Sequence, residues 1–216
     1  MLKKLLLLLT ATSTILLPTA EASDWGGIHD YILKYSINDE WAVYNRYETI
    51  SRDDFEDTYF GLIDLGLAYK LDDHWTLSGY YRQCWLQSAS TGDWSTEHRP
   101  LVELNYGTKL NDIALSSRSR LEFRIYEGDK EDDMRYRNRL RADMPWDIVG
   151  IKPYLEEELF FSDNYDGFFG QNWLTAGVYY KIDHVKLRVG YRWQASKSGN
   201  SWKSKNLLAT NLMFFF

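Results

Sequence analysis

Cysteine, proline and long apolar segments are scarce in this 216-residue chain, and each scarcity argues against a class of protein. The single cysteine, Cys84, excludes a disulfide-stapled scaffold and a cysteine-based zinc cluster. Four prolines are too few for a proline-rich disordered chain. A formal charge of −6 argues against a nucleic-acid binder, so we expect no nucleic-acid partner. No segment after residue 22 is apolar and long enough for a membrane-spanning helix.

The N-terminus has the pattern of an export signal. Lys3 and Lys4 precede an apolar run over residues 5–17, and Ala20-Glu21-Ala22 fits a cleavage site. The run is shorter than the span of about 20 residues that a membrane anchor needs. We therefore predict a cleavable signal peptide over residues 1–22 and a single domain over residues 23–216.

The rest of the chain alternates with a period of two residues, which is typical of β-strands. In residues 113–127, Leu121 and Phe123 fall on one face, while Arg120, Glu122 and Arg124 fall on the other. A helix would mix these two sets. The runs that we interpret as strands are 28–37, 40–49, 58–71, 75–86, 97–110, 113–127, 134–144, 151–161, 173–181, 185–194 and 206–216.

The connections between these runs alternate in kind. Short ones carry Asn or Asp, as tight hairpin turns do, and polar ones at 51–57, 87–94, 128–133, 162–170 and 195–205 are predicted as long loops. This layout predicts an all-β, antiparallel, up-and-down transmembrane β-barrel of about 10 to 12 strands, with short periplasmic turns and longer extracellular loops. Because bacterial barrels usually have an even number of strands, a barrel of ten strands is an alternative. It would start at residue 40, with 28–37 as a partial strand, a lumen segment or half of an unseen pair.

The charged face of the strands decides where the barrel sits. Burying so many charges in a dry core would cost several kcal/mol for each unpaired charge, whereas an apolar face against lipid leaves the charges in the lumen. Aromatic residues, 16% of the chain, gather near predicted strand ends, as interface girdles do. We therefore expect the bacterial outer membrane, with its lipid and lipopolysaccharide as partners. The alternative is a secreted soluble β-sandwich with one charged sheet face.

The last strand resembles the signal that the barrel-assembly machinery recognises, which makes that machinery the expected partner in biogenesis. Phe216, Phe214 and Leu212 share one face, and the final residue is aromatic. A soluble protein would seldom leave such a strand at a free edge.

Two neighbouring strands carry arginines at alternate positions, Arg118, Arg120 and Arg124 with Glu122 between them, and Arg135, Arg137, Arg139 and Arg141, so all seven arginines point to one side. Two interpretations remain open: a salt-bridge ladder that fills a narrow lumen, and a cationic track for an anionic solute. The predicted lumen ladder comprises Arg82, Arg99, Arg118, Arg120, Glu122, Arg124, Arg135, Arg137, Arg139, Arg141, Arg188 and Arg192, with Glu97, Glu103, Glu156 and Glu158 as partners.

Several stretches resemble a family of uncharacterised Gram-negative outer-membrane barrels known only as a domain of unknown function. They are Glu97-His98-Arg99-Pro100, the Arg118–Arg124 and Arg137–Arg141 alternations, Pro153 with Leu159-Phe160, and the final strand. The arginine common in that family after Asn172 is Trp173 in this chain. The resemblance implies fold and location. The chain is also loosely similar, in architecture alone, to small porins for acidic oligosaccharides.

From these patterns we expect a small porin-like channel for anionic or small polar solutes. The alternatives are a structural or interaction barrel with a plugged lumen, and a lipid-modifying enzyme. For the enzyme, His98 faces outward near a rim with Ser95 close by, but no serine lies two residues from it on the same face. We therefore predict no enzyme, no catalytic residue, no cofactor and no metal site.

Overall fold

Strands account for most of the part of the chain that the computed structural model describes, residues 25–128, 130–165, 168–199 and 201–216. No helix in this part is long and apolar enough to cross a membrane. The signal peptide predicted for residues 1–22 lies outside the described residues. In chain order the strands are β1 (Trp25–Ser36), β2 (Trp41–Arg52), β3 (Asp57–Lys70), β4 (Trp75–Gln87), β5 (Trp94–Leu110), β6 (Ile113–Tyr126), β7 (Asp133–Asp143), β8 (Ile151–Ser162), β9 (Phe169–Ile182), β10 (Val185–Ser198) and β11 (Ser201–Phe215).

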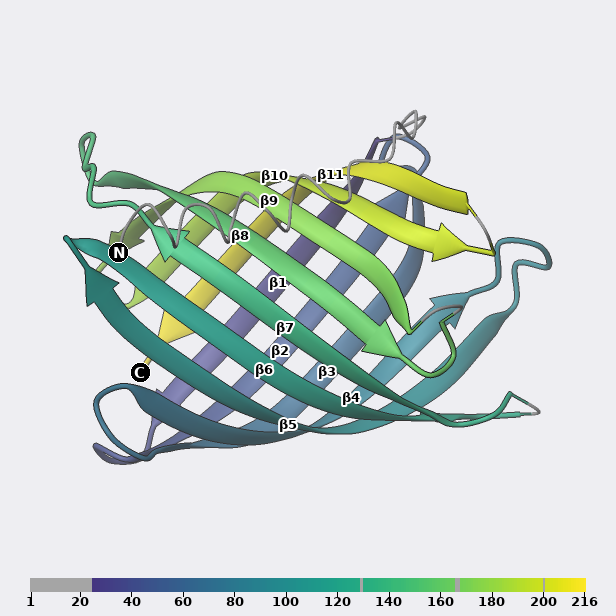
Figure 1. Ribbon diagram of the computed structural model, residues 1–216, viewed down its shortest axis with the longest axis horizontal. Helices are drawn as coiled ribbons and strands as arrows, with labels where there is room; N and C mark the ends of the chain where they lie inside the picture. The colour runs from purple at the N-terminus through teal and green to yellow at the C-terminus, as the bar shows by residue number, and fades with distance from the viewer. Residues whose placement is uncertain (1–24, 129, 166–167, 200) are drawn as a thin grey trace.

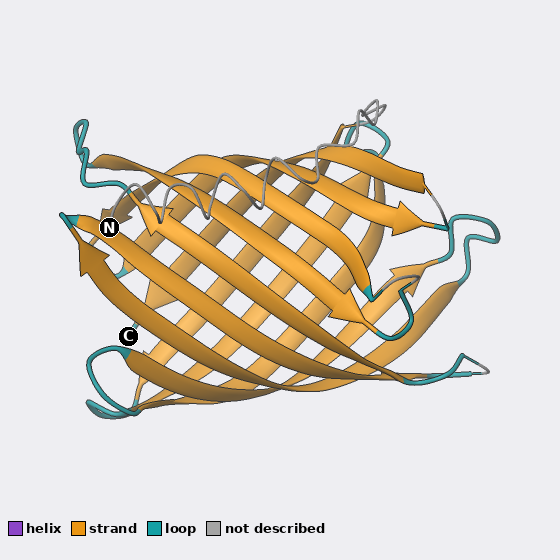
Figure 2. Ribbon diagram, viewed as in Figure 1, coloured by secondary structure: helices purple, strands orange, loops and turns teal. Residues whose placement is uncertain are grey.

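The strands form one closed barrel in which each strand pairs with its neighbours in sequence, and β1 closes the ring against β11 (Figures 1 and 2). Ten of the eleven pairings are antiparallel, and β1 with β11 is parallel. The predicted all-β barrel is therefore confirmed. The ten-strand version is wrong, because residues 25–36 form a complete strand that is paired on both sides.

The parallel closure places the two ends of the barrel chain at opposite rims. The amide of Phe216 donates to the carbonyl of Lys34 (2.9 Å), and the amide of Ser36 donates to the carbonyl of Phe216 (2.8 Å). The C-terminus therefore lies beside the β1–β2 turn, while Trp25 starts β1 at the other rim (Figure 1). An odd strand number requires one parallel pair, as antiparallel neighbours alone close only an even ring.

The connections follow the turn chemistry of the sequence only in part. Asn111 and Asp112 form a two-residue turn with φ of 48° and 67°, the left-handed conformation that Asn and Asp tolerate. At the other rim, however, the polar segment predicted as a loop over 195–205 is mostly strand, because β10 runs to Ser198 and β11 starts at Ser201. Polar residues there continue the hydrogen-bonded ladder and do not interrupt it.

The alternation of β3 fixes which face is inside. Asp64 is 3% exposed and its neighbour Leu65 is 61% exposed, and the same alternation continues through Leu67 and Ala68. The apolar side chains thus point outward and the charged ones inward, the reverse of a soluble barrel. One small apolar cluster lies inside, where Ile28, Ile50 and Leu207 pack with Tyr59 and Phe60.

Aromatic side chains line the outer wall at the rim that contains the β1–β2 turn. Trp41 packs on Tyr69 and Trp75 packs on Tyr106, each pair with ring centroids 4.7 Å apart. Tyr35 on β1 is 60% exposed. Such an outward band fits the interface between lipid and water, where the apolar ring and the polar tip of these residues are both solvated.

Candidate functional site

The inward faces of β4 to β8 hold a dense network of ion pairs centred on Glu122. This side chain is fully buried and accepts hydrogen bonds from Arg135 (Nε, 2.9 Å) and Arg137 (Nη1, 2.9 Å). Arg120 and Arg82 add contacts at 3.3 Å and 3.5 Å. One carboxylate thus serves four arginines, and its two oxygens fix the register of β6 and β7 from within.

The surrounding carboxylates are shared in the same way. Asp64 takes a bidentate pair of hydrogen bonds from Arg82, at 2.6 and 2.7 Å. Three further carboxylates each join two arginines: Glu97 with Arg99 and Arg124, Glu103 with Arg118 and Arg120, and Glu158 with Arg118 and Arg137. Opposite charges therefore alternate across this wall, which removes the repulsion that facing arginine ladders would suffer.

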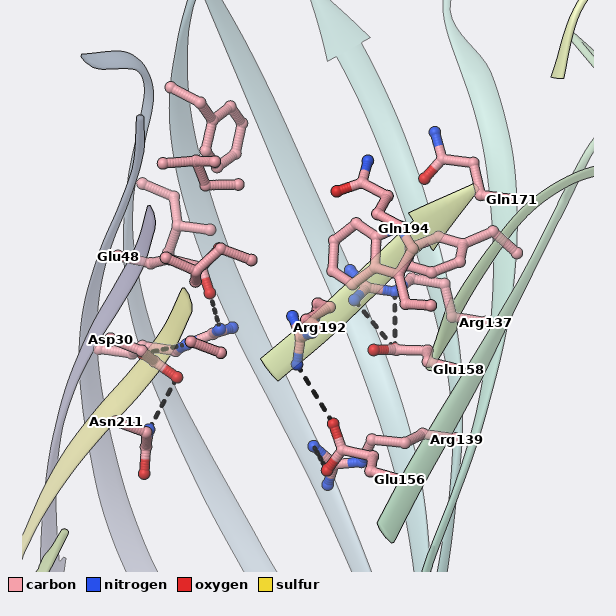
Figure 3. Close-up of a pocket in the computed structure, with 18 of the residues that line it drawn as sticks. Asp30, Glu48, Arg137, Arg139, Glu156, Glu158, Gln171, Arg192, Gln194 and Asn211 are labelled. Atoms are coloured by element: carbon pink, nitrogen blue, oxygen red, sulfur yellow. Dashed lines mark hydrogen bonds and ion pairs between the residues drawn. The ribbon is translucent and has the colours of Figure 1, made fainter. Parts of the chain in front are cut away.

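The wall formed by β7, β8 and β10 is less well compensated. Glu156 is shared by Arg192 (3.3 Å), Arg141 (3.6 Å) and Arg139 (3.7 Å). Figure 3 shows Arg139 and Arg192 reaching this carboxylate from different strands. Arg188 follows on β10, and the Nε atom of its side chain is buried without a hydrogen-bond partner.

A second wall faces this cluster across the lumen. On β1 and β2, Arg46 pairs with Asp30 (2.7 Å) and with Glu48, and Asn211 of β11 donates to Asp30 (2.8 Å). Asp30 and Asn211 lie on the side of the lumen opposite Arg139 in Figure 3. Our site prediction missed Asp30 because the role of its strand was left open; the available signal was a charged residue directly before the alternating apolar residues Tyr31 and Leu33.

A cavity of about 260 Å³ lies between these walls. Its lining contains ten arginines and four carboxylates. Asp64, Glu97, Glu103 and Glu122 lie behind the lining and pair with several of these arginines, so the positive charge that remains is a smaller excess. Donors of this lining, the Nε of Arg188, the Nε of Arg118 and the indole nitrogen of Trp173, are buried without partners, as is the amide oxygen of Gln194. Buried polar atoms without partners are costly, so the protein does not satisfy this part of the lining by itself.

The predicted ladder divides into residues that line this cavity and residues behind them. The cavity is lined by Arg82, Arg99, Arg118, Arg135, Arg137, Arg139, Arg141, Glu156, Glu158, Arg188 and Arg192. Glu97, Glu103, Arg120, Glu122 and Arg124 do not line it and complete the ion pairs. Trp173, at the position where the resembling family commonly has arginine, also lines the cavity.

The predicted assembly residues lie at the seam of the barrel. Leu212 is opposite Tyr31 and Phe214 is opposite Leu33 in the parallel β1–β11 pair. Tyr31 and Leu33 are outward-facing and half exposed, so the two C-terminal side chains join the apolar outer wall. Phe216 contributes through the backbone hydrogen bonds that close the ring.

His98 lies outside the lumen, on the outer wall near a rim. Its Nδ1 lies 2.7 Å from the Tyr81 hydroxyl oxygen, within hydrogen-bond distance, and its Nε2 lies 3.3 Å from a carboxylate oxygen of Glu127. The hydroxyl of Ser95 instead donates to the carbonyl of Leu86. A serine–histidine pair is therefore absent at His98 in the described structure. Among the described residues, no group of three or more His, Cys, Asp or Glu side chains is placed to hold a metal ion.

Comparison with known proteins adds the fold and the family. The family model described as "Protein of unknown function (DUF2490)" matches residues 26–205. A solved structure titled "NanC porin structure in rhombohedral crystal form" superimposes with a TM-score of 0.52 at 16% identity, covering 85% of this chain and 94% of that one. At this identity the likeness shows the fold alone. No curated protein matches the chain.

Proposed function

Because the chain belongs to the family described as protein of unknown function (DUF2490), we propose its role from its own geometry: an outer-membrane, porin-like channel for small anionic or polar solutes. The observation that carries the proposal is the excess of arginine over carboxylate in the lumen wall of β7, β8 and β10, where Arg139, Arg141, Arg188 and Arg192 have Glu156 and Asp143 beside them. Rings of arginine and lysine favour anions in pores. The porin-like fold of the solved neighbour agrees with a channel.

The outer wall supports the membrane location. Leu65 (61% exposed), Leu67 and Leu33 are large apolar residues on the outside, whereas a soluble monomer seldom exposes a wide apolar surface. Outer-membrane lipid and lipopolysaccharide are the proposed surroundings, and the barrel-assembly machinery the proposed partner in biogenesis. The polar rim segments would face the lipopolysaccharide sugars.

Conductance measurements test this function. The purified full barrel is inserted into a planar lipid bilayer between unequal KCl concentrations. It is expected to pass current, with a reversal potential closer to the equilibrium potential of chloride than to that of potassium. A cation-selective pore or a silent barrel would contradict the proposal. Cell fractionation with the protein outside the outer-membrane fraction would contradict the location.

The plugged, structural barrel is the second candidate, and the ion-pair network around Glu122 favours it. Four arginines meet this carboxylate, and the whole group is buried. Small barrels are commonly filled by their own side chains. This candidate predicts no conductance in the same bilayer, together with envelope defects and unchanged solute uptake when the gene is deleted.

A further inference from the structure

Positive charge is distributed unevenly along the inner wall. In the network on β3 to β8, seven arginines (Arg82, Arg99, Arg118, Arg120, Arg124, Arg135 and Arg137) meet six carboxylates (Asp64, Glu97, Glu103, Glu122, Asp133 and Glu158). Beside it on β7, β8 and β10, five cations (Arg139, Arg141, Lys186, Arg188 and Arg192) have two carboxylates of their own (Asp143 and Glu156), and Arg139 also lies opposite Glu158 of the first group. The first group can satisfy itself, and the second group lacks negative charge.

Arg188 shows this deficit most clearly. Within the described part of the chain, no carboxylate oxygen lies within the 4.0 Å of an ion pair from its guanidinium, and its Nε has no hydrogen-bond partner. The charges that act on it most strongly are those of Arg141 and Arg139, followed by Glu156. A guanidinium held near two others, with no carboxylate in ion-pair contact, is stabilised when an anion binds to it.

Glu156 does not supply that anion. Its contacts with Arg192, Arg141 and Arg139 are 3.3 to 3.7 Å long, whereas charge-assisted pairs in this barrel reach 2.5 to 2.9 Å. One carboxylate divided among three arginines leaves each of them with donors to spare. Arg192 donates its Nε to Thr175 and its Nη2 to Glu156 (3.3 Å), the second of which Figure 3 draws as a dashed line.

Neutral polar groups lie next to these arginines in the cavity lining. The indole nitrogen of Trp173 is a buried donor without a partner, and the amide oxygen of Gln194 is a buried acceptor without one. The guanidinium of Arg192 stacks on the Trp173 ring, with 5.0 Å to the centroid, so the indole is held in place. A cavity of about 260 Å³ is at the small end for ligand pockets.

We propose that the lumen contains one discrete, saturable site for an oxyanion, the carboxylate or phosphate of a small solute, formed by Arg139, Arg188 and Arg192. Trp173 and Gln194 contact the polar body of that solute. The arginines of the β3–β8 network serve structure, so the two interpretations of the ladder apply to different parts of it. The inference deepens the proposed channel function, but a binding site can be tested without conductance.

Calorimetric titration of the detergent-solubilised full barrel with inorganic phosphate tests the site. Wild type is expected to bind with saturation at one site per barrel. Arg188→Gln should weaken binding by about tenfold or more, because a charged donor group with no internal partner is removed. Arg52→Gln is the matched control: it removes the same charge at the rim, where Arg52 pairs with Asp57, outside the cavity lining. It should stay within about twofold.

A second titration separates the solute classes. D-Glucuronate and D-glucose differ by a carboxylate in place of a hydroxymethyl group, so glucuronate should bind in competition with phosphate and glucose should not. Trp173→Phe keeps an aromatic ring at this position and removes the indole N–H donor, so it should weaken the binding of glucuronate more than that of phosphate. Folding of every variant is checked by heat-modifiable electrophoretic mobility, and Arg192→Lys gives a second, charge-conserving test, with weakened binding expected.

Several outcomes would overturn the site. Phosphate binding that does not saturate in wild type would show attraction by the general positive charge of the barrel and no discrete site. Equal losses of phosphate affinity in Arg188→Gln and Arg52→Gln would show the same. If the titration fails in either of these ways while the bilayer measurement shows an anion-selective pore, the proposed channel function stands and the discrete site is rejected. A silent barrel that still binds phosphate through Arg188 would reject the channel and keep the site.

Discussion

Replacement of the Glu122 carboxylate should destabilise the barrel more than any other single isosteric change in the network. Glu122→Gln keeps the size of the side chain and removes its charge. The residue is 0% exposed and contacts four arginines, of which Arg135 and Arg137 donate at 2.5 to 2.9 Å. Removing one partner from a buried ion-pair group costs about 3 to 5 kcal/mol, because the remaining charges stay desolvated.

Urea-induced unfolding in lipid vesicles, followed by tryptophan fluorescence, measures this loss. Glu127→Gln is the control, because this carboxylate is 62% exposed, and its effect should stay within about 0.5 kcal/mol. The double variant with Arg135→Gln should be less destabilised than the sum of the single variants, by about 0.5 to 3 kcal/mol. A loss below about 1 kcal/mol for Glu122→Gln would refute the claim that the network is buried and structural.

Three further predictions concern the outer wall, the seam and a turn. Leu65→Arg places a charge on the exposed apolar face and should lower the free energy of unfolding in vesicles by about 2 to 4 kcal/mol, the cost of an arginine near the bilayer midplane. Leu65→Met is the control and should be nearly neutral. Equal stabilities of the two variants would contradict a lipid-facing Leu65. Deletion of Phe216 removes two backbone hydrogen bonds between the C-terminus and β1, so insertion into vesicles should slow, and an unchanged rate would argue against the seam as the closing step. The amides of His74 and Trp75 donate to Asp72 and lower the pKa of its carboxyl. The stabilising effect of this carboxylate is therefore present above its pKa in the unfolded chain and is lost as the pH falls through its pKa in the folded barrel. An NMR titration should find the pKa of Asp72 below that of a peptide with the same turn sequence, and equal values would contradict these hydrogen bonds.

The strands and their inward faces follow from the sequence because the side-chain period in a strand is fixed at two. Arg118, Arg120, Glu122 and Arg124 have to share a side whatever their neighbours do, and the exposed Leu65 beside the buried Asp64 obeys the same rule. The excess of charge on one face then indicates which side meets lipid.

The closure of the ring could not be predicted in this way. Alternation fixes which face of β1 points inward, but it does not fix whether β1 pairs with β11 in parallel or stays outside the sheet. That choice depends on the strand number and on contacts between residues about 180 positions apart, such as His29 with Thr210. The same limit applies to the partner of His98, which is Tyr81 on the neighbouring strand.

The partition of the arginines was also beyond the sequence. All of them share a face and a spacing, and only the three-dimensional positions of the carboxylates separate Arg120, which contacts Glu103 and Glu122, from Arg188, which has no comparable partner among the described residues. Cross-strand register decides which charges meet, and a shift of one residue would reverse every face.

Accessibility of opposite faces in lipid tests the whole account most directly. Single spin labels at position 65 on the outside and position 139 in the lumen, in a Cys84→Ser background, can be compared in vesicles for collisions with oxygen and with a water-soluble nickel chelate. An apolar outer wall and a charged lumen predict that the label at position 65 collides with oxygen dissolved in the lipid, while the label at position 139 does not. A water-exposed label at 65, or a lipid-exposed label at 139, would contradict it.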